Sequence, residues 1–542
     1  MSKFHTPAPT MPSSGSGQRM FSRSRTGCRT CRLKKVKCDE ARPQCQRCRR
    51  LRRFCDYSNQ TELVAQDSMQ ANHRRGELIL QLPAFSSSAC SISLTAVDHE
   101  AIRYFRTTFA RRNHTKNPDY SVYSVIFTIA QSEPLVMHTV LALACRAIQP
   151  RDEATSIISR RQNWHHLFHY SSALGRLKEE LEKSPGSNES FHFDACFTAL
   201  YVMLVYEQHF GDDDGFAGLA HHLQGAAMVL RHCGHHIRRD LDAETLATPP
   251  LDICQRGGSS ERRLSLYSAR ILIWMSLCDA TAATYGIGGS FNAALNEILG
   301  SDDPEGIERL HTFSNSLFRV VWGEAYPQAE LTDDIENRSV FELTVCCSRA
   351  RYSLATLARA VNAGDVEASQ ACTRATKSLI QYLAARYREL LEVASGLLPC
   401  TDHSHRLVAN LRGIVPHYHA AVIVFSRLAD KVPDSRVSVD IKPHVDSIMS
   451  LARQAYRHQG SDAMVRIAWP LLVVSLETTH LPTRNWIIAR FQSMATLGKN
   501  MERATDFLRN SVGPSKATGG VTACWADPAR WFRSTDGTPF II

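Results

Sequence analysis

Apolar residues recur at helical spacing along most of the chain beyond residue 97. Ile102, Phe105 and Phe109 lie three and four positions apart, so they share one face of a helix. No run of alternating apolar and polar residues is bounded by hairpin turns. We therefore predict an all-α region from 97 to about 511. Similar helical patterns occur in segments 163–184, 265–284, 340–362, 371–396, 404–428, 443–457 and 484–510.

Several helix boundaries follow from local signals. Pro134 suits the first turn of a helix over LVMHTVLALACRAI, and Pro150 comes just after its end. Leu219, Leu223, Ala226 and Leu230 form an apolar stripe, which Gly234 is expected to end. The uncharged run 195–206 has twelve residues, fewer than the roughly 18 of a membrane span, so we predict a buried helix there.

The first hundred residues have a different composition. Residues 1–25 are rich in Ser, Pro and Gly, which predicts disorder, and their apolar content is too low for a secretory signal. Residues 58–96 are polar and end in a Ser-rich stretch, which is typical of a linker. We therefore divide the chain into 1–25, 26–57, 58–96 and an all-α domain at 97–542.

Positive charge is concentrated in one short segment. Residues 1–57 contain fifteen Lys or Arg against three acidic residues, a net charge of +12, whereas the whole chain carries +10. The remaining residues therefore sum to about −2. This distribution predicts a small polyanion-binding domain joined to a nearly neutral body.

Six of the seventeen cysteines lie within 28 residues. The spacing CxxC-x6-C occurs twice, and the second copy follows the first by seventeen positions, with Pro43 in the connecting loop. The other eleven cysteines are scattered without a disulfide pattern, which indicates a reducing compartment. The clustered cysteines are Cys28, Cys31, Cys38, Cys45, Cys48 and Cys55.

Counting ligands leads to two zinc ions. A closed zinc site takes four ligands, so two sites need eight positions, and six thiolates supply eight only if two of them bridge both ions. The duplication favours Cys28 and Cys45, the first cysteine of each copy, as the bridges. No position stays open for water, so we expect structural zinc. Metal storage is the alternative, but storage proteins have a higher cysteine density and no appended body of about 450 residues.

Residues 28–55 resemble the DNA-binding domain of the fungal zinc binuclear cluster family, whose pattern they match completely, including CRLKKVKC and Pro43. The resemblance implies that a short helix of the first CxxC-x6-C copy enters the major groove over a CGG-type triplet of double-stranded DNA. Lys35 would be the main base contact with Lys34 beside it, whereas Arg32 and Lys37 would contact phosphate. Arginines of the second copy would lie nearer the DNA backbone: Arg47, Arg49, Arg50, Arg52 and Arg53.

The body resembles the helical regulatory domain that follows the cluster in this family, above all in the phrase HLQGAAMVLRHCG. The resemblance implies a nuclear regulator of RNA polymerase II genes that works with co-regulators, and no catalysis. The two basic groups, 34–37 and 47–53, also suit nuclear import. Residues 58–96 have no sustained heptad, so a monomer and a homodimer formed through the body both stay open.

An enzyme with a DNA-targeting domain is the rival hypothesis. His165 and His169 share a helix face, but HHLFH lacks the glutamate of a zinc-protease helix. His232, Cys233, His235 and His236 surround Gly234, where we expect them to cap a helix end. The C-terminal aromatic residues, among them Trp525 and Phe540, suit either an activation surface or a packed end.

Overall fold

The structure is a computed structural model of the 542-residue chain, and it falls into two units, residues 1–84 and 85–542, which are described separately. The predicted disordered segment 1–25 and most of the predicted linker lie outside the described residues, so the predicted domain boundaries stay predictions. The described residues are 28, 30–31, 36–41, 44–51, 92–113, 116–149, 157–182, 193–211, 216–242, 264–300, 305–401, 405–433, 435, 439–510, 524–535 and 537–542.

The first unit contains one described helix with printed bounds, α2 (Gln46–Arg50). The second unit is all-α over the residues that the structure describes, apart from one isolated bridge between Arg533 and Pro539. The predicted fold class is confirmed. The first half of this unit contains α4 (Ala96–Tyr104), η1 (Phe105–Phe109), α5 (Ala110–Asn113), η2 (Pro118–Tyr120), α6 (Val122–Ser132), α7 (Pro134–Ile148), α8 (Ile157–Leu181), α9 (Phe193–Phe210), α10 (Ala217–Asp242), α11 (Leu266–Thr284) and α12 (Ser290–Leu299).

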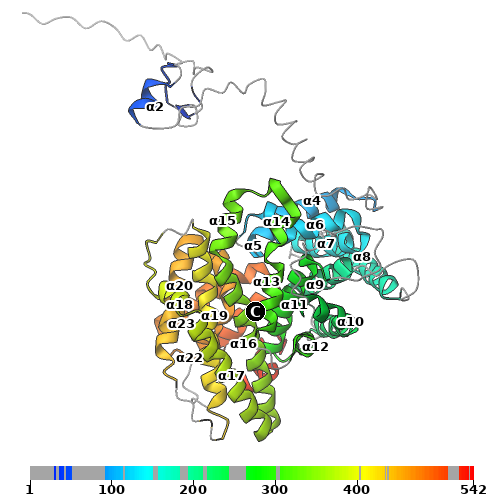
Figure 1. Cartoon of the computed structure of the whole chain (residues 1–542), viewed down its shortest axis with the longest axis vertical. Helices are drawn as coiled ribbons and strands as arrows, with labels where there is room; N and C mark the ends of the chain where they lie inside the picture. Colours follow the sequence, from blue (N-terminus) through cyan, green and yellow to red (C-terminus); the bar gives the residue numbers. More distant parts are fainter. Residues whose placement is uncertain are drawn as a thin grey trace, which may run out of the picture. The chain divides into compact units, whose positions relative to one another are not determined.

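The second half continues with further helices, the longest of which has 26 residues. It contains α13 (Gly306–Phe313), η3 (Ser314–Ser316), α14 (Leu317–Trp322), η4 (Gly323–Ala325), α15 (Gln328–Glu336), α16 (Arg338–Ala363), α17 (Val366–Arg386), α18 (Arg388–Ser395), α19 (Arg406–Ala429), α20 (Lys442–Gln459), α21 (Ser461–Arg466), α22 (Ala468–Glu477), α23 (Leu481–Met494), η5 (Ala495–Leu497), α24 (Lys499–Asn510) and α26 (Pro528–Trp531). Helix α16 contacts α11, α17 and α19, and it lies near the middle of the unit (Figure 1).

Most predicted boundaries agree with these helices. Helix α7 begins at Pro134, as expected from the fixed φ of proline. Every residue from Ala195 to Tyr206 is buried in α9, which confirms the predicted core helix. Among the helices that the structure describes, none is both long and apolar enough to span a membrane. The described cysteines of this unit are all free thiols, in agreement with the absence of a disulfide pattern.

The expected helix end at Gly234 is wrong. Helix α10 continues to Asp242, and Gly234 lies in its interior. A Cβ atom at this position would lie 2.7 Å from Cγ1 of Ile298, so the missing side chain lets α12 approach α10 closely. The glycine serves helix packing, and positions 232–236 lie in the interior of α10 rather than at its end.

The C-terminal aromatic residues form a packed end. Phe532 and Phe540 are 1% and 0% exposed, and both rings lie against Tyr285, the C-cap residue of α11. Phe507 of α24 contacts the same two rings. Of the two interpretations of this segment, the structure therefore favours a packed end over an activation surface.

Candidate metal centre and nucleic-acid interface

Five of the six predicted zinc ligands form the core of the first unit. Cys28 and Cys45 are 0% exposed, Cys31 and Cys48 are 2% exposed, and Cys38 is 8% exposed. In the described part of this unit, Val36 is the partly buried hydrophobic residue packed against them. The core is thus made of sulfur rather than hydrocarbon. Cys55, the sixth predicted ligand, lies outside the described residues.

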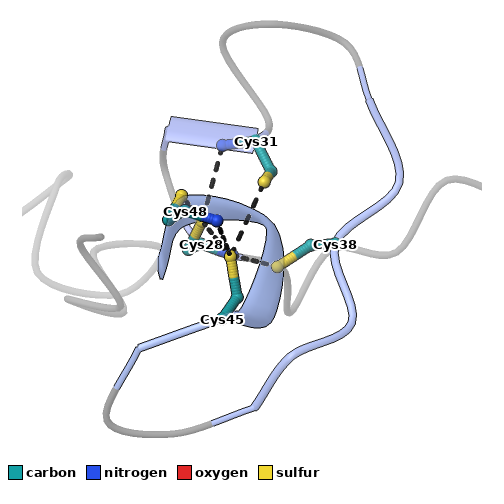
Figure 2. Packing of buried hydrophobic residues seen from close by; sticks show 5 residues of the cluster. All are labelled: Cys28, Cys31, Cys38, Cys45 and Cys48. Carbon is teal, nitrogen blue, oxygen red and sulfur yellow. Dashed lines mark hydrogen bonds between the residues drawn. The ribbon is translucent and has the colours of Figure 1, made fainter. Parts of the chain in front are cut away.

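The sulfur atoms lie close together without forming disulfides. Sγ of Cys28 is 3.7 Å from Sγ of both Cys45 and Cys48, and Sγ of Cys31 is 3.9 Å from Sγ of Cys45. A disulfide needs about 2.05 Å, so all five are free thiols. The sulfurs of Cys28, Cys31, Cys45 and Cys48 all lie within 4.8 Å of one another, and the side chains converge in Figure 2.

The two sequence copies have the same local geometry. The amide of Cys31 donates to Sγ of Cys28 over 3.5 Å, and the amide of Cys48 donates to Sγ of Cys45 over 3.3 Å. In the second copy this contact caps the N-terminus of α2, for which Cys45 is the N-cap residue. The first cysteine of each CxxC pair therefore has its sulfur fixed by the backbone three residues later.

Asp39, which no sequence motif indicates, links the segment after Cys38 to the start of α2. Its Oδ2 accepts from the amide of Gln46 over 2.9 Å, at the start of α2. This hydrogen bond lowers the pKa of the Asp39 carboxyl below its ordinary value. Glu40 has a positive φ of 58°, and its amide donates to Sγ of Cys38 over 3.4 Å. The N-cap position of α2 is Cys45, six residues after Asp39, so no local capping pattern indicates this role.

The donor set suits zinc. Burial raises the pKa of the Cys31 thiol to about 12, with further contributions from hydrogen bonds to Cys28 and Cys45 and from the charges of Cys28 and Cys38. Clustered thiolates therefore oppose one another unless a cation lies among them. Zn²⁺ prefers thiolate ligands in a closed tetrahedral arrangement, and its charge would offset this repulsion. The predicted zinc cofactor thus fits the residues present.

Basic residues next to the cluster cysteines in the sequence are exposed. On α2, Arg47, Arg49 and Arg50 are exposed, while Cys48 of the same helix faces inward. Lys37, a predicted phosphate contact, is also exposed. The other three predicted DNA contacts, Arg32, Lys34 and Lys35, lie outside the described residues. Exposed cations on a short, metal-supported scaffold are able to contact DNA phosphates.

A second group of potential metal ligands lies in the body. The sequence indicated its two histidines but not its aspartate. His165 and His169 of α8 lie with Nε2 at 2.7 Å and 3.1 Å from Oδ1 of Asp98. Nδ1 of His169 lies 2.9 Å from Nδ1 of His138 on α7. If both Nε2 atoms carry protons, both rings donate to Asp98, and Nδ1 of His169 accepts from His138.

This network satisfies its own hydrogen bonds and links three helices, so we describe it as structural. Oδ2 of Asp98 completes a capping box with Thr95 at the start of α4. The spacing of Thr95 and Asp98 in the sequence is a local signal for a capping box. No local signal indicates that Asp98 lies close to His165, 67 residues away.

Comparisons with known proteins point in one direction. Residues 101–511 match the fungal specific transcription factor domain, and residues 26–63 match the fungal Zn(2)-Cys(6) binuclear cluster domain. The chain is 40% identical over 77 residues to the aspercryptin biosynthesis cluster-specific transcription regulator atnN of Emericella nidulans, which is 14% of this chain and 11% of that protein. It is 41% identical over 58 residues to transcription factor lfc1 of Flammulina velutipes, which is 11% of this chain and 19% of that protein.

A third relative is the transcriptional regulatory protein pro1 of Neurospora crassa, which is 32% identical over 79 residues, 15% of this chain and 11% of that protein. In these three alignments the chain therefore spans less than a fifth of each relative's own length. No solved structure matches the chain.

Proposed function

Since this chain belongs to the fungal specific transcription factors, with a zinc binuclear cluster domain at residues 26–63, we propose that it is a sequence-specific DNA-binding regulator of RNA polymerase II genes. The observation that carries the proposal is the buried sulfur cluster beneath the exposed arginines of α2. Its place of action would be the nucleus. Its family is one of transcription factors rather than enzymes.

The proposed metal centre holds two zinc ions on six cysteines. Cys28 and Cys45 would bridge the two zinc ions. This assignment is supported by the proximity of each to a sulfur of the other sequence copy: Cys28 lies near Cys48, and Cys45 lies near Cys31. When bound, zinc would supply the folding free energy of this short segment, on the order of 10–16 kcal/mol in small zinc modules. The measurement that checks the stoichiometry is two zinc ions per purified chain.

We assign base reading to the first CxxC-x6-C copy. Lys35 would contact guanine O6 and N7 of a CGG-type triplet in the major groove, with Lys34 beside it. Arg32 and Lys37, together with the exposed arginines of α2, would contact phosphate and set the position on the duplex. The helical body would relay signals to co-regulators. The chain would bind DNA either as a monomer or as a homodimer formed through this body.

The proposal is tested by selecting bound duplexes from a random pool with the full chain, followed by affinity measurements on two variants. Lys35→Ala should weaken binding to the preferred triplet by about 1–3 kcal/mol and flatten discrimination between sequences. Arg49→Ala is the matched control, because loss of a phosphate contact should weaken all sequences about equally and reduce the salt slope by about 1. An equal loss on every duplex with Lys35→Ala would contradict base reading by this residue.

A further inference from the structure

The helical body contains a cavity of about 560 Å³, lined by residues of this unit. Its walls come from α11, α13 to α16, α19 and α21, and α11, α16 and α19 lie next to one another in the middle of the body (Figure 1). Sites for small organic ligands typically measure 300–1,000 Å³ and combine apolar walls with a few polar groups. The size of this cavity therefore suits a small metabolite.

The cavity has an excess of positive charge. Its lining has six lysines or arginines and one carboxylate, Asp334. Lys116 forms ion pairs with Asp334 and, over 3.4 Å, with Glu330. Among the other cations, Arg351 donates to the main-chain oxygen of Ile542 over 3.3 Å and to the hydroxyl of Thr284 over 3.2 Å. The remaining four have no ion pair to any residue that the structure describes: Arg270, Arg319, Arg338 and Arg466. Unbalanced cations around a partly enclosed cavity favour an anionic ligand.

Two polar side chains that line the cavity each have a buried atom without a partner. Within the described residues, neither Nε of Arg270 nor Nδ1 of His311 has a hydrogen-bond partner, and His311 is only 2% exposed. Burial lowers the pKa of His311 to about 3, and the charges of Arg270 and Arg338 lower it further. Burial also lowers the pKa of Arg270 to about 10. A buried polar atom without a partner is unfavourable, and a ligand carboxylate would accept from Nε of Arg270 or from Nδ1 of His311 in its N–H form.

Two hydrogen bonds from Nη2 hold the guanidinium of Arg270 in place. Its Nη2 donates to the main-chain oxygen of Ser314 over 3.0 Å and to Oδ1 of Asn315 over 3.2 Å. The positioned group still has Nε available, so it resembles a preorganised anion receptor rather than a free surface arginine.

Apolar side chains line the next turns of the same helices. On α11, Ile273, Trp274 and Leu277 follow Arg270 at helical spacing, and on α16 Phe341 and Val345 follow Arg338. A ligand with one charged end would therefore meet Arg270 and Arg338 beside the apolar side chains of the next turns, while Arg351 lies further along α16.

We infer that this cavity binds an amphipathic organic acid, with its carboxylate on Arg270 and His311 and its apolar chain along Trp274 and Leu277. The inference goes beyond the proposed function, since it assigns a small-molecule site to the body. It does not depend on DNA recognition by residues 26–57.

The test uses the full chain and fluorescent probes of matched shape. The anionic probe 1-anilinonaphthalene-8-sulfonate should bind saturably, with one cavity site per chain. Decanoate should displace it at a concentration at least about tenfold lower than decan-1-ol, because only the acid makes charge-assisted hydrogen bonds. The neutral probe N-phenyl-1-naphthylamine shows how much binding the apolar walls provide alone.

Two variants locate the site. Arg270→Met should weaken binding of decanoate about tenfold and leave that of N-phenyl-1-naphthylamine unchanged, whereas Arg374→Met, at an exposed cation outside the cavity, should change neither. Gly413→Phe should block both probes, because a Cβ at Gly413 meets only Cδ of Arg466, at 4.0 Å, and the side chain would enter the cavity. Gly175→Phe is the matched control on an exposed face of α8.

Circular dichroism of each variant checks that the body stays folded, and Arg270→Met decides the question if Gly413→Phe does not fold. Equal displacement by decanoate and decan-1-ol would overturn the inference. So would the absence of a saturable site, or unchanged decanoate affinity in Arg270→Met. Cys31→Ser should abolish DNA binding and leave decanoate binding intact, so failure here and failure of the proposed function are distinguishable.

Discussion

The cysteine-rich unit and the helical body contain cores of different chemistry. In the described part of the first unit, five cysteines and Val36 are the groups packed together. In the body the core is hydrocarbon, including fully buried side chains such as Trp469 and Phe491. Residues 1–57 carry a net charge of +12, while the remaining residues are nearly neutral. The same chain thus folds one unit by metal binding and the other by burial of apolar surface.

This difference shows which interactions supply the free energy of folding in a short segment and in a large domain. A fully buried apolar side chain contributes about 1.5–3 kcal/mol, so a body with dozens of them is stable without a ligand. A segment of about 30 residues has no such reserve and needs metal, disulfides or a partner. The two units should therefore respond independently to changes in metal, pH and packing.

Metal removal should separate the two units most strongly. A strong zinc chelator, or the substitution Cys45→Ser at a proposed bridging position, should unfold the first unit and abolish specific DNA binding, because the metal supplies its folding free energy. The body should keep its helical circular dichroism and its thermal unfolding midpoint. Zinc content, DNA binding and circular dichroism measured on the same sample check this.

The control for metal removal is Cys145→Ser, at a buried cysteine of α7 in the body. This change should leave zinc content and DNA binding unaltered, although it replaces a cysteine in the same way. A body that melts together with zinc release would show that the two units do not fold independently.

Local spacing explains what the sequence could predict. The zinc ligands follow from the repeat of CxxC-x6-C, because ligands within 28 residues are brought together by short loops. The helices follow from apolar periodicity, which determines which face is buried but not what covers it. Arg270 and His311 belong to different helices, and Asp98 lies 71 residues from His169. No periodicity in one segment reports such a juxtaposition.

The error at Gly234 has the same origin. Glycine in a helical pattern commonly marks a helix end, and the local signal was interpreted in that way. The glycine instead accommodates Ile298 of α12, a contact made 64 residues later in the chain. Tertiary packing overrode the local preference.

Acidification should destabilise the body through its buried histidines. Burial lowers the pKa of His138 to about 4, from an ordinary value of 6.5, and the charges of His169 and Arg176 lower it further, while Asp98 raises it. The unfolded chain therefore takes up a proton near pH 6.5 that the folded body takes up only near pH 4. Stability should be complete above pH 6.5 and fall between these values, by on the order of 3 kcal/mol for this residue.

Urea unfolding at pH 7.0, 6.0 and 5.0 measures this loss. His138→Gln keeps a donor toward His169 and removes the titrating ring, so its stability should depend less on pH than that of the wild-type chain. His232→Gln, at an exposed position of α10, should retain the wild-type dependence. Zinc release from the first unit also occurs in acid, because ligands must be deprotonated, so the two transitions are followed with separate signals. An unaltered pH profile in His138→Gln would show that other groups dominate.

The smallest effect tests the packing of the body alone, at two glycines of one helix. Gly225→Ala in α10 meets no atom within 4 Å and should stabilise the body by about 1 kcal/mol, because alanine favours the helix. Gly234→Ala should instead destabilise it by about 1–3 kcal/mol, since its Cβ would lie 2.7 Å from Ile298. Both changes should leave DNA affinity unchanged, because the first unit does not draw on this core. Equal stabilisation by the two alanines in urea titrations would mean that α12 does not depend on the missing side chain, and a change in DNA affinity would show that packing in the body reaches the cysteine-rich unit.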